Sequence, residues 1–123
     1  MIKEIIYVGI GGGIGSIFRY LTSFYSQKIF PGDYPWGTFL VNMIGCLVIG
    51  LLLGLIEKER MLFPQMRQLL IVGFCGGFTT FSSFAAENIR LIQSGQLMLV
   101  LLYTAASVLL GLAAVGLGLY LVK

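Results

Sequence analysis

The sequence predicts an all-α membrane protein whose four spanning helices form a single domain over residues 1–123. The first reason is composition: 58% of the residues are hydrophobic and only 11% are charged, whereas soluble domains carry about 25% charged residues. The second reason is length, because a chain of 123 residues buries too small a share of its surface to hide so much apolar area from water. The third is that four apolar stretches each reach about 20 residues, the length at which a helix crosses a bilayer.

The predicted spans are separated by short polar segments. They cover about residues 5–25, 36–56, 68–92 and 97–122. The loop SQKIFPGDYPWG, with its turn-forming Pro and Gly residues, lies between the first two spans. The charged connector EKERMLFPQMRQ follows the second span, and the turn QSGQ follows the third. These connectors leave no room for a soluble domain, so we expect a multi-pass protein of the cell membrane (plasma or inner membrane).

The charged and polar side chains exclude several functions. The net charge is +3 and the basic residues are scattered, so nucleic acid is not an expected partner. The chain has no histidine, which removes the commonest general base and the commonest metal ligand. Nothing pairs a nucleophile with a base, so we do not expect an enzyme.

Charge specifies the orientation of the chain only weakly. Four spans place both termini on one side. The basic residues that would share that side are Lys3, Lys58, Arg60, Arg67 and Lys123. Lys28 and Arg90 would lie on or near the other side. The positive-inside rule therefore favours cytoplasmic termini by a modest excess, and a chain with so weak a bias could insert in either direction.

The first span combines small residues with one charge. In GIGGGIGSIFRY, pairs such as Gly11 and Gly15 are four residues apart, a spacing that lets another helix approach closely. Arg19 lies inside the apolar run, where a charge costs several kcal/mol unless it reaches the interface or lines water. Two interpretations stay open for Arg19: a side chain that snorkels to the nearer interface, or a cation at the mouth of an anion path.

The second span, GTFLVNMIGCLVIGLLLGLI, has one strongly polar side chain in its middle, Asn42. Thr38 lies one helical turn earlier on the same face. Such an Asn either binds a neighbouring helix or donates its amide hydrogens to an ion. Gly50 and Gly54 form a further close-packing pair.

The third span contains the unusual stretch GFCGGFTTFSSFAAE. Gly76 and Gly77 weaken the helix near the membrane midplane, and four hydroxyl residues follow. Non-helical backbone at this depth is tolerated only where it is buried in protein or lines a cavity, and in transporters such breaks present polar groups to ions. The sequence therefore predicts a broken third helix at an ion site, with carbonyl groups suited to Na⁺ and hydroxyl and amide donors suited to an anion.

Two aromatic rings follow the predicted break. Phe81 and Phe84 are three residues apart and share a helix face. They are packing residues, or they present their positive ring edges to an anion, which would bind it weakly enough to release it. Beyond them, Glu87 either pairs with Arg90 at i,i+3 or serves as the coupling carboxylate of a proton antiporter.

The fourth span carries a stripe of residues that recur every four positions, Tyr103, Ser107 and Gly111. The two hydroxyls either donate to the same path as Asn42 or bind neighbouring helices.

These segments together resemble the Fluc/CrcB family of fluoride ion channels, over nearly the whole chain. The resemblance is carried by GGGIGSIFRY in the first span, GTFLVNMIG in the second, GFCGGFTTFSSF in the third and the Tyr103/Ser107 stripe in the fourth. The third segment is the most specific, because it looks like the family pattern G-x-x-G-G-x-T-T-F-S-T-F. Ser83 stands where the usual residue is Thr, a change that keeps the hydroxyl and loses a methyl group.

The resemblance implies an architecture and a set of site residues. Proteins of this family are four-helix subunits that pair as antiparallel, dual-topology homodimers with two fluoride pores. A central structural Na⁺ lies at the dimer interface, held by backbone carbonyls that match Gly76 and Thr79. The residues that match the pore are Arg19, Thr38, Asn42, Phe81, Ser83, Phe84, Tyr103 and Ser107.

The function implied by the resemblance is passive export of fluoride from the cytoplasm, which relieves fluoride toxicity. Hydrogen fluoride crosses bilayers as a neutral molecule and ionises in a less acidic cytoplasm, and a pore lets the ion leave. One alternative is a small proton-coupled multidrug exporter, which requires a buried carboxylate in the first helix. The first span has none, so Glu87 would have to substitute. A second alternative is a structural or assembly subunit that transports nothing.

Overall fold

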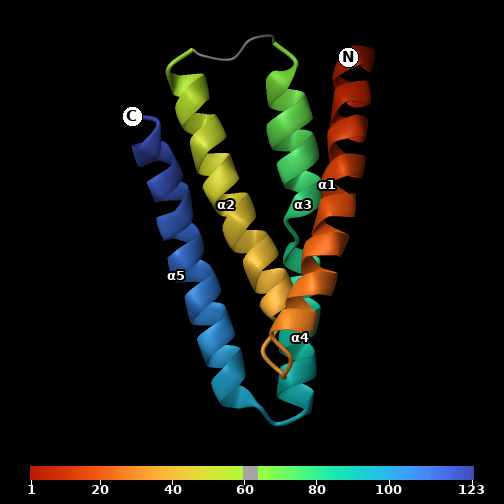
Figure 1. The fold of residues 1–123 in the computed structure, drawn as a ribbon, viewed down its shortest axis with the longest axis vertical. Coiled ribbons are helices and arrows are strands. Elements are labelled where there is room, and N and C mark those ends of the chain that lie inside the picture. The colour runs from red at the N-terminus through yellow and green to blue at the C-terminus, as the bar shows by residue number, and fades with distance from the viewer. Residues whose placement is uncertain (60–63) are drawn as a thin grey trace.

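The computed structural model of the protein describes residues 1–59 and 64–123, so Arg60, counted above on the side of the termini, lies outside the described ranges. The described elements are helices (Figure 1): α1 (Ile2–Ile29), α2 (Trp36–Glu57), the π-helix η1 (Arg67–Cys75), α3 (Gly76–Phe78), α4 (Phe81–Gln93) and α5 (Leu97–Leu121). In these ranges four helical spans are long and apolar enough to cross a membrane, with η1, α3 and α4 together forming the third. The expected all-α fold with four spans is confirmed.

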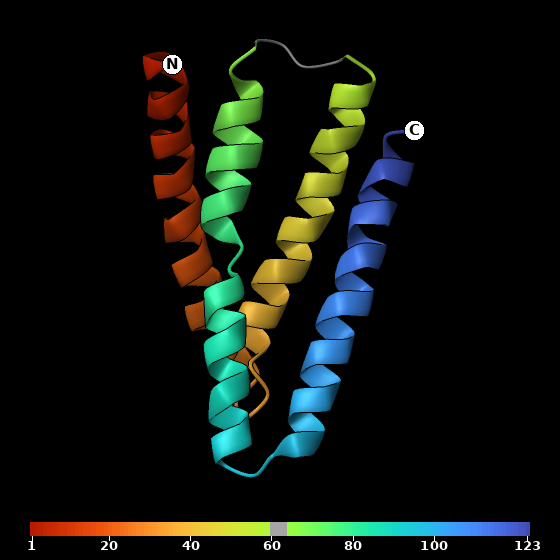
Figure 2. The same ribbon diagram turned by 180° about the vertical axis from the view of Figure 1, so that it is seen from behind.

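The four spans run along the long axis of the molecule, with both termini at one end (Figures 1 and 2). The loop between α1 and α2 and the turn between α4 and α5 lie at the opposite end. The strongest contacts pair α2 with α5 and α1 with η1, and α1 contacts α2 and α3 to an equal, lesser extent. The segment just before the helix break, α3, therefore packs mainly on α1 and only weakly on α2.

Small residues allow α1 to lie directly on the third span. Gly11 and Gly15 are buried, and a Cβ added to either would collide with the backbone carbonyl oxygen of Leu69 or Phe74, respectively. Close packing through the Gly11/Gly15 pair is thus confirmed.

Glycines also allow α2 to pack closely on α5. A Cβ on Gly50 would collide with the carbonyl oxygen of Val115, and one on Gly54 would collide with the side chain of Val122. The expectation that Gly50 and Gly54 are a close-packing pair is therefore confirmed.

The third span is broken at Thr79 and Thr80 rather than at the glycines. Thr79 (φ −83°, ψ 158°) and Thr80 (φ −153°, ψ 120°) are extended, whereas Gly76 keeps helical angles (φ −63°, ψ −36°). The prediction of a broken third helix is confirmed. Of the residues expected to break it, the glycine pair stays helical, whereas the first threonine, Thr79, is extended. Gly77 serves packing instead, because a Cβ there would lie only 2.5 Å from the carbonyl oxygen of Gly12 on α1.

Candidate functional site

The helix break is held open by the side chain of Asn42. Its Oδ1 accepts a hydrogen bond from the Thr80 backbone nitrogen at 2.9 Å, and its Nδ2 donates to the Thr80 carbonyl oxygen at 3.1 Å. One carboxamide thus pairs with both backbone groups of a residue that has left the helix, which removes the cost of burying them unpaired. Because an amide NH₂ carries two hydrogens, Asn42 keeps one for a further acceptor.

The threonine at the break also starts the next helix. Thr80 is the N-cap of α4, and its Oγ1 accepts from the Ser83 backbone nitrogen at 3.2 Å, the usual pattern for a threonine cap. Thr79 closes the preceding segment, since both its backbone nitrogen and its Oγ1 donate to the Cys75 carbonyl oxygen. The sequence TT therefore ends one helix and begins another.

Arg19 reaches the break from α1. Its Nε donates to the Gly77 carbonyl oxygen at 2.9 Å, where a continuous α-helix would place the Phe81 nitrogen as the donor. The side chain therefore replaces a lost helical hydrogen bond with a charge-assisted one. This is not a snorkelling geometry, and Arg19 lines neither of the two cavities described below.

Two carbonyl groups at the break lose their helical donors. In a continuous helix the Gly76 oxygen would accept from the Thr80 nitrogen and the Thr79 oxygen from the Ser83 nitrogen. These nitrogens bind Asn42 Oδ1 and Thr80 Oγ1 instead. Among the hydrogen bonds of the described residues, none ends on the Gly76 or the Thr79 oxygen. The two carbonyls matched to a Na⁺ ligand set are thus freed at the break, and unwound backbone carbonyls are the donors that Na⁺ finds in such helices.

A cavity of about 330 Å³ lies beside the break, between α2, α4 and α5. We call it the phenylalanine cavity. It is lined by Asn42, Met43, Cys46, Ile49, Thr79, Thr80, Phe81, Phe84, Ser107 and Val108. Four residues matched to the fluoride pore, Asn42, Phe81, Phe84 and Ser107, therefore lie around one space although they come from three helices.

The lining of the phenylalanine cavity is mostly apolar, with a few hydrogen-bond donors. The Phe81 and Phe84 rings are adjacent, with centroids 5.7 Å apart and planes tilted by 40°. Phe81 is 78% exposed in the single chain, which leaves the cavity open on that side. The Ser107 hydroxyl oxygen is buried and has no hydrogen-bond partner among the described residues. Ser107 and the second amide hydrogen of Asn42 are thus free to donate to a guest.

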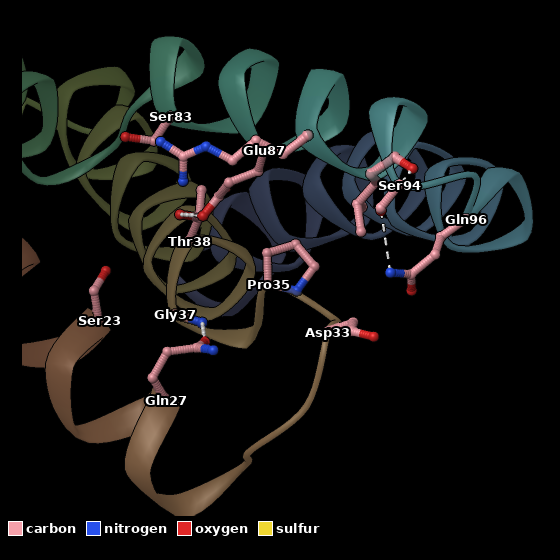
Figure 3. A pocket seen from close by; sticks show the side chains of 12 residues that line it. Ser23, Gln27, Asp33, Pro35, Gly37, Thr38, Ser83, Glu87, Ser94 and Gln96 are labelled. Carbon is pink, nitrogen blue, oxygen red and sulfur yellow. Dashed lines mark hydrogen bonds between the residues drawn. The ribbon is translucent and has the colours of Figure 1, made fainter.

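A second, larger cavity of about 680 Å³ is shown in Figure 3. It includes residues of the α1–α2 loop and the α4–α5 turn, which lie at the end of the bundle opposite the termini (Figure 1). We call it the polar cavity. It is lined by Ser23, Gln27, Asp33, Pro35, Gly37, Thr38, Ser83, Glu87, Arg90, Leu91, Ser94 and Gln96. Thr38 and Ser83 of the predicted pore residues belong to it, so the structure divides the predicted set between two spaces.

A hydrogen-bonded cluster of three side chains borders the polar cavity, because two of its members, Thr38 and Glu87, line that cavity. Thr38 Oγ1 donates to Glu87 Oε2 at 2.8 Å, as Figure 3 shows, and the Tyr103 hydroxyl donates to Glu87 Oε1 at 2.9 Å. Tyr103 is fully buried, and its ring contacts Phe84 with centroids 4.8 Å apart. Tyr103 thus links the cluster by a ring contact to Phe84, which lines the phenylalanine cavity.

Of the two interpretations of Glu87, the i,i+3 pair with Arg90 is not found. Its carboxylate oxygens instead accept from the hydroxyls of Thr38 on α2 and Tyr103 on α5. One signal was available in the sequence: Thr38, Glu87 and Tyr103 each lie within about two helical turns of the same end of their spans. Polar residues at one depth in three neighbouring helices are placed to meet.

Known proteins resemble this chain over nearly its whole length. Residues 6–119 match the family described as "CrcB-like protein, Camphor Resistance (CrcB)". The chain belongs to the CrcB family. Its relatives include proteins named "Fluoride-specific ion channel FluC" from Flavobacterium psychrophilum, 46% identical over 98% of this chain and 98% of the relative, and from Bacteroides fragilis, 48% identical over 97% and 95%. A relative of the same name from Gloeothece citriformis is 48% identical over 98% and 97%.

Membership of the CrcB family bears on the earlier expectations. The resemblance drawn from the four sequence segments is confirmed. The names of the relatives describe ion channels, which is not an enzymatic activity, so the expectation that the chain is not an enzyme agrees with them. Together with the four apolar spans, they support a multi-pass membrane protein.

Proposed function

We propose that this chain is a fluoride channel that lets F⁻ leave the cytoplasm passively. Two facts support the proposal. Relatives 42–48% identical are named fluoride-specific ion channels, and six of the eight residues matched to the pore line one of the two cavities. The observation that carries it is the phenylalanine cavity, where Asn42 and the unpaired hydroxyl of Ser107 face a space walled by two phenyl rings.

Selection of fluoride follows from the donors in this cavity. Fluoride is small and strongly hydrated, so it enters only where close donors replace its water. Ser107 and the second amide hydrogen of Asn42 supply hydrogen bonds, and the edges of Phe81 and Phe84 supply a weak positive potential. Among the described residues, the lining of this cavity includes no full positive charge, so the ion binds weakly enough to leave.

Thr38 and Tyr103 are not assigned to fluoride binding in this proposal. Each hydroxyl has one hydrogen, and both direct it to Glu87. They donate to fluoride only after turning away from the carboxylate, whereas Ser107 is available at rest. We therefore assign Ser107 and Asn42 to ion binding, and Thr38 and Tyr103 to holding Glu87 in the wall of the polar cavity.

We also propose that two chains pair as an antiparallel homodimer around a structural Na⁺. The freed carbonyl oxygens of Gly76 and Thr79 from both chains would hold the ion, because hard oxygen donors suit Na⁺. The 78% exposed ring of Phe81 supports a partner on this face of the chain, and the weak charge bias suits insertion in both orientations. Each dimer would then carry two fluoride pores.

Growth of a bacterium that lacks its own fluoride exporter tests the proposed function. Expression of the chain is expected to restore growth in fluoride, and Ser107→Ala is expected to restore it less, because the free donor is lost. Equal growth with and without the chain, at confirmed expression in the membrane, would reject fluoride export.

The multidrug exporter alternative is tested separately with Glu87→Gln. A proton-coupled exporter that uses Glu87 as its coupling carboxylate loses transport when this group can no longer ionise. A fluoride channel keeps most of its conductance, because glutamine fills the same space and still accepts one hydrogen bond. Complete loss of fluoride flux in a folded Glu87→Gln protein would favour a coupled mechanism.

A further inference from the structure

The phenylalanine cavity holds two sulfur atoms that the proposed passage of fluoride does not use. Met43 and Cys46 both line it and lie one helical turn apart on α2. A Cβ placed on Gly111 of α5 would lie 3.5 Å from both Cys46 Sγ and Met43 Cε. The two side chains therefore point at the same spot on α5. Thiol and thioether groups are soft donors, which select soft metal ions.

The second cysteine of the chain lacks this access. Cys75 is fully buried and lines neither cavity, whereas Cys46 is only partly buried and borders a space of about 330 Å³. The same space receives the buried Ser107 hydroxyl, which has no partner among the described residues. No charged side chain belongs to its lining. The cavity thus offers room, two soft donors and one unpaired oxygen donor to a neutral metal complex.

We propose that Cys46 and Met43 form a soft-metal site inside the phenylalanine cavity, and that mercury(II) bound there blocks fluoride. The block rests on the proposed function, because it requires fluoride to pass this cavity. Neutral HgCl₂ enters, the Cys46 thiol loses its proton, and a sulfur–mercury bond forms as one chloride leaves. The products are the Cys46 thiolate–HgCl adduct, H⁺ and Cl⁻, and no electron is transferred. The Met43 sulfur is a weaker second ligand, and the bound metal lies beside Asn42 and Ser107.

Fluoride efflux from liposomes that contain the purified chain tests the block. Each variant is measured with and without micromolar HgCl₂, and the treated rate is divided by that variant's own untreated rate. Wild type and Cys75→Ser are expected to lose efflux about tenfold or more, since the occupied cavity no longer lets the ion through. Cys46→Ser is expected to keep its rate, and Met43→Leu is expected to need more HgCl₂.

Mass spectrometry of the treated proteins tests binding without any flux measurement. One mercury is expected on Cys75→Ser and none on Cys46→Ser, and digestion of treated wild type is expected to place the metal on the peptide that contains Cys46. Mercury on Cys75 alone would overturn the site, and this result needs no variant to fold. Mercury on Cys46 with unchanged efflux would overturn the block while the proposed function stands. No efflux from untreated wild type would reject the proposed function instead, and the mass measurement would still report on the site.

Discussion

At the residue scale, the position of Asn42 is compatible with both roles that the sequence left open, binding a neighbouring helix and donating to an ion. It binds a neighbouring segment, since its carboxamide pairs with both backbone groups of Thr80. It also borders the phenylalanine cavity with one amide hydrogen unassigned. A single asparagine can therefore hold the helix break open and face an anion at the same time.

Asn42→Asp separates these two roles. Aspartate still accepts from the Thr80 nitrogen, but it cannot donate to the Thr80 oxygen, and it adds a negative charge to an anion path. We expect fluoride efflux to fall by roughly 100-fold, equivalent to about 3 kcal/mol. The measurement is efflux from liposomes per folded protein, with folding checked by gel filtration.

Asn88→Asp is the matched control for this charge change. Asn88 also hydrogen-bonds across the bundle, from its Nδ2 to Thr104, but it lines neither cavity. It is expected to keep most of the fluoride efflux. An Asn42→Asp protein as active as wild type would show that the Asn42 amide does not face the ion.

The two phenylalanines differ in what their loss costs. Phe81 is 78% exposed, whereas Phe84 packs on Tyr103. We expect Phe81→Ile and Phe84→Ile both to reduce fluoride flux, because isoleucine has no positive ring edge. Phe84→Ile is expected to lower thermal stability more than Phe81→Ile, because it loses two ring contacts, with Phe81 and Tyr103, each worth about 0.5–1.5 kcal/mol. Undiminished flux in both variants would reject the ring-edge role.

At the element scale, the sequence predicted the broken third helix but not which residues break it. A glycine pair lowers helix propensity, yet Gly76 stays helical and the threonines are extended. The deciding interactions are long-range ones, the pairing of Asn42 with Thr80 and of Arg19 with Gly77. The helix propensity of the third span carries no information about Asn42 and Arg19, because these partners lie on other helices.

The π-helix η1 was likewise not predicted. The apolar pattern of Arg67–Cys75 does not distinguish hydrogen bonds to the fourth residue from those to the fifth. The close-packing role of the glycines could be predicted from the sequence, because small residues spaced four apart indicate a helix–helix contact. The spacing does not depend on which helix is the partner. The sequence therefore indicates that α1 and α2 pack closely on other helices, and the structure identifies η1 and α5 as those partners.

Gly77→Val tests the packing role of the glycine pair. Its Cβ would lie 2.5 Å from the Gly12 carbonyl oxygen, and backbone cannot move aside as a side chain can. We expect a loss of about 1–3 kcal/mol in stability, as for other overpacked contacts, together with reduced flux. The measurement is thermal unfolding in detergent, followed by liposome efflux.

Gly116→Val provides the comparison for that substitution. A Cβ on Gly116 of α5 meets nothing within 4 Å, so the added side chain is expected to leave the unfolding temperature close to that of wild type. A Gly77→Val protein with wild-type stability and flux would show that the close approach of α1 is not required.

At the scale of the whole molecule, the four-span fold belongs to the single chain, whereas the homodimer is a proposal. The freed carbonyls of Gly76 and Thr79 supply two oxygens per chain, which is too few for a complete cation shell. A second chain would double the number. The broken helix thereby links the proposed sodium site to the proposed dimer.

Replacing Na⁺ by a large organic cation tests this link. We expect the dimer to dissociate or to unfold at a lower temperature in N-methylglucamine, because ligand binding to the folded state stabilises it. Restoring Na⁺ is expected to recover both the dimer and its efflux. The measurements are light scattering in detergent and thermal unfolding, and identical behaviour in both cations would contradict a structural sodium.

The central claim is that this chain by itself conducts fluoride, and one measurement tests it directly. Liposomes are loaded with fluoride, reconstituted with the purified chain and diluted into fluoride-free solution, while an electrode follows the released ion. We predict rapid fluoride efflux that depends on the protein, and no comparable efflux when chloride replaces fluoride. Fluoride release no faster than from protein-free liposomes would contradict the claim.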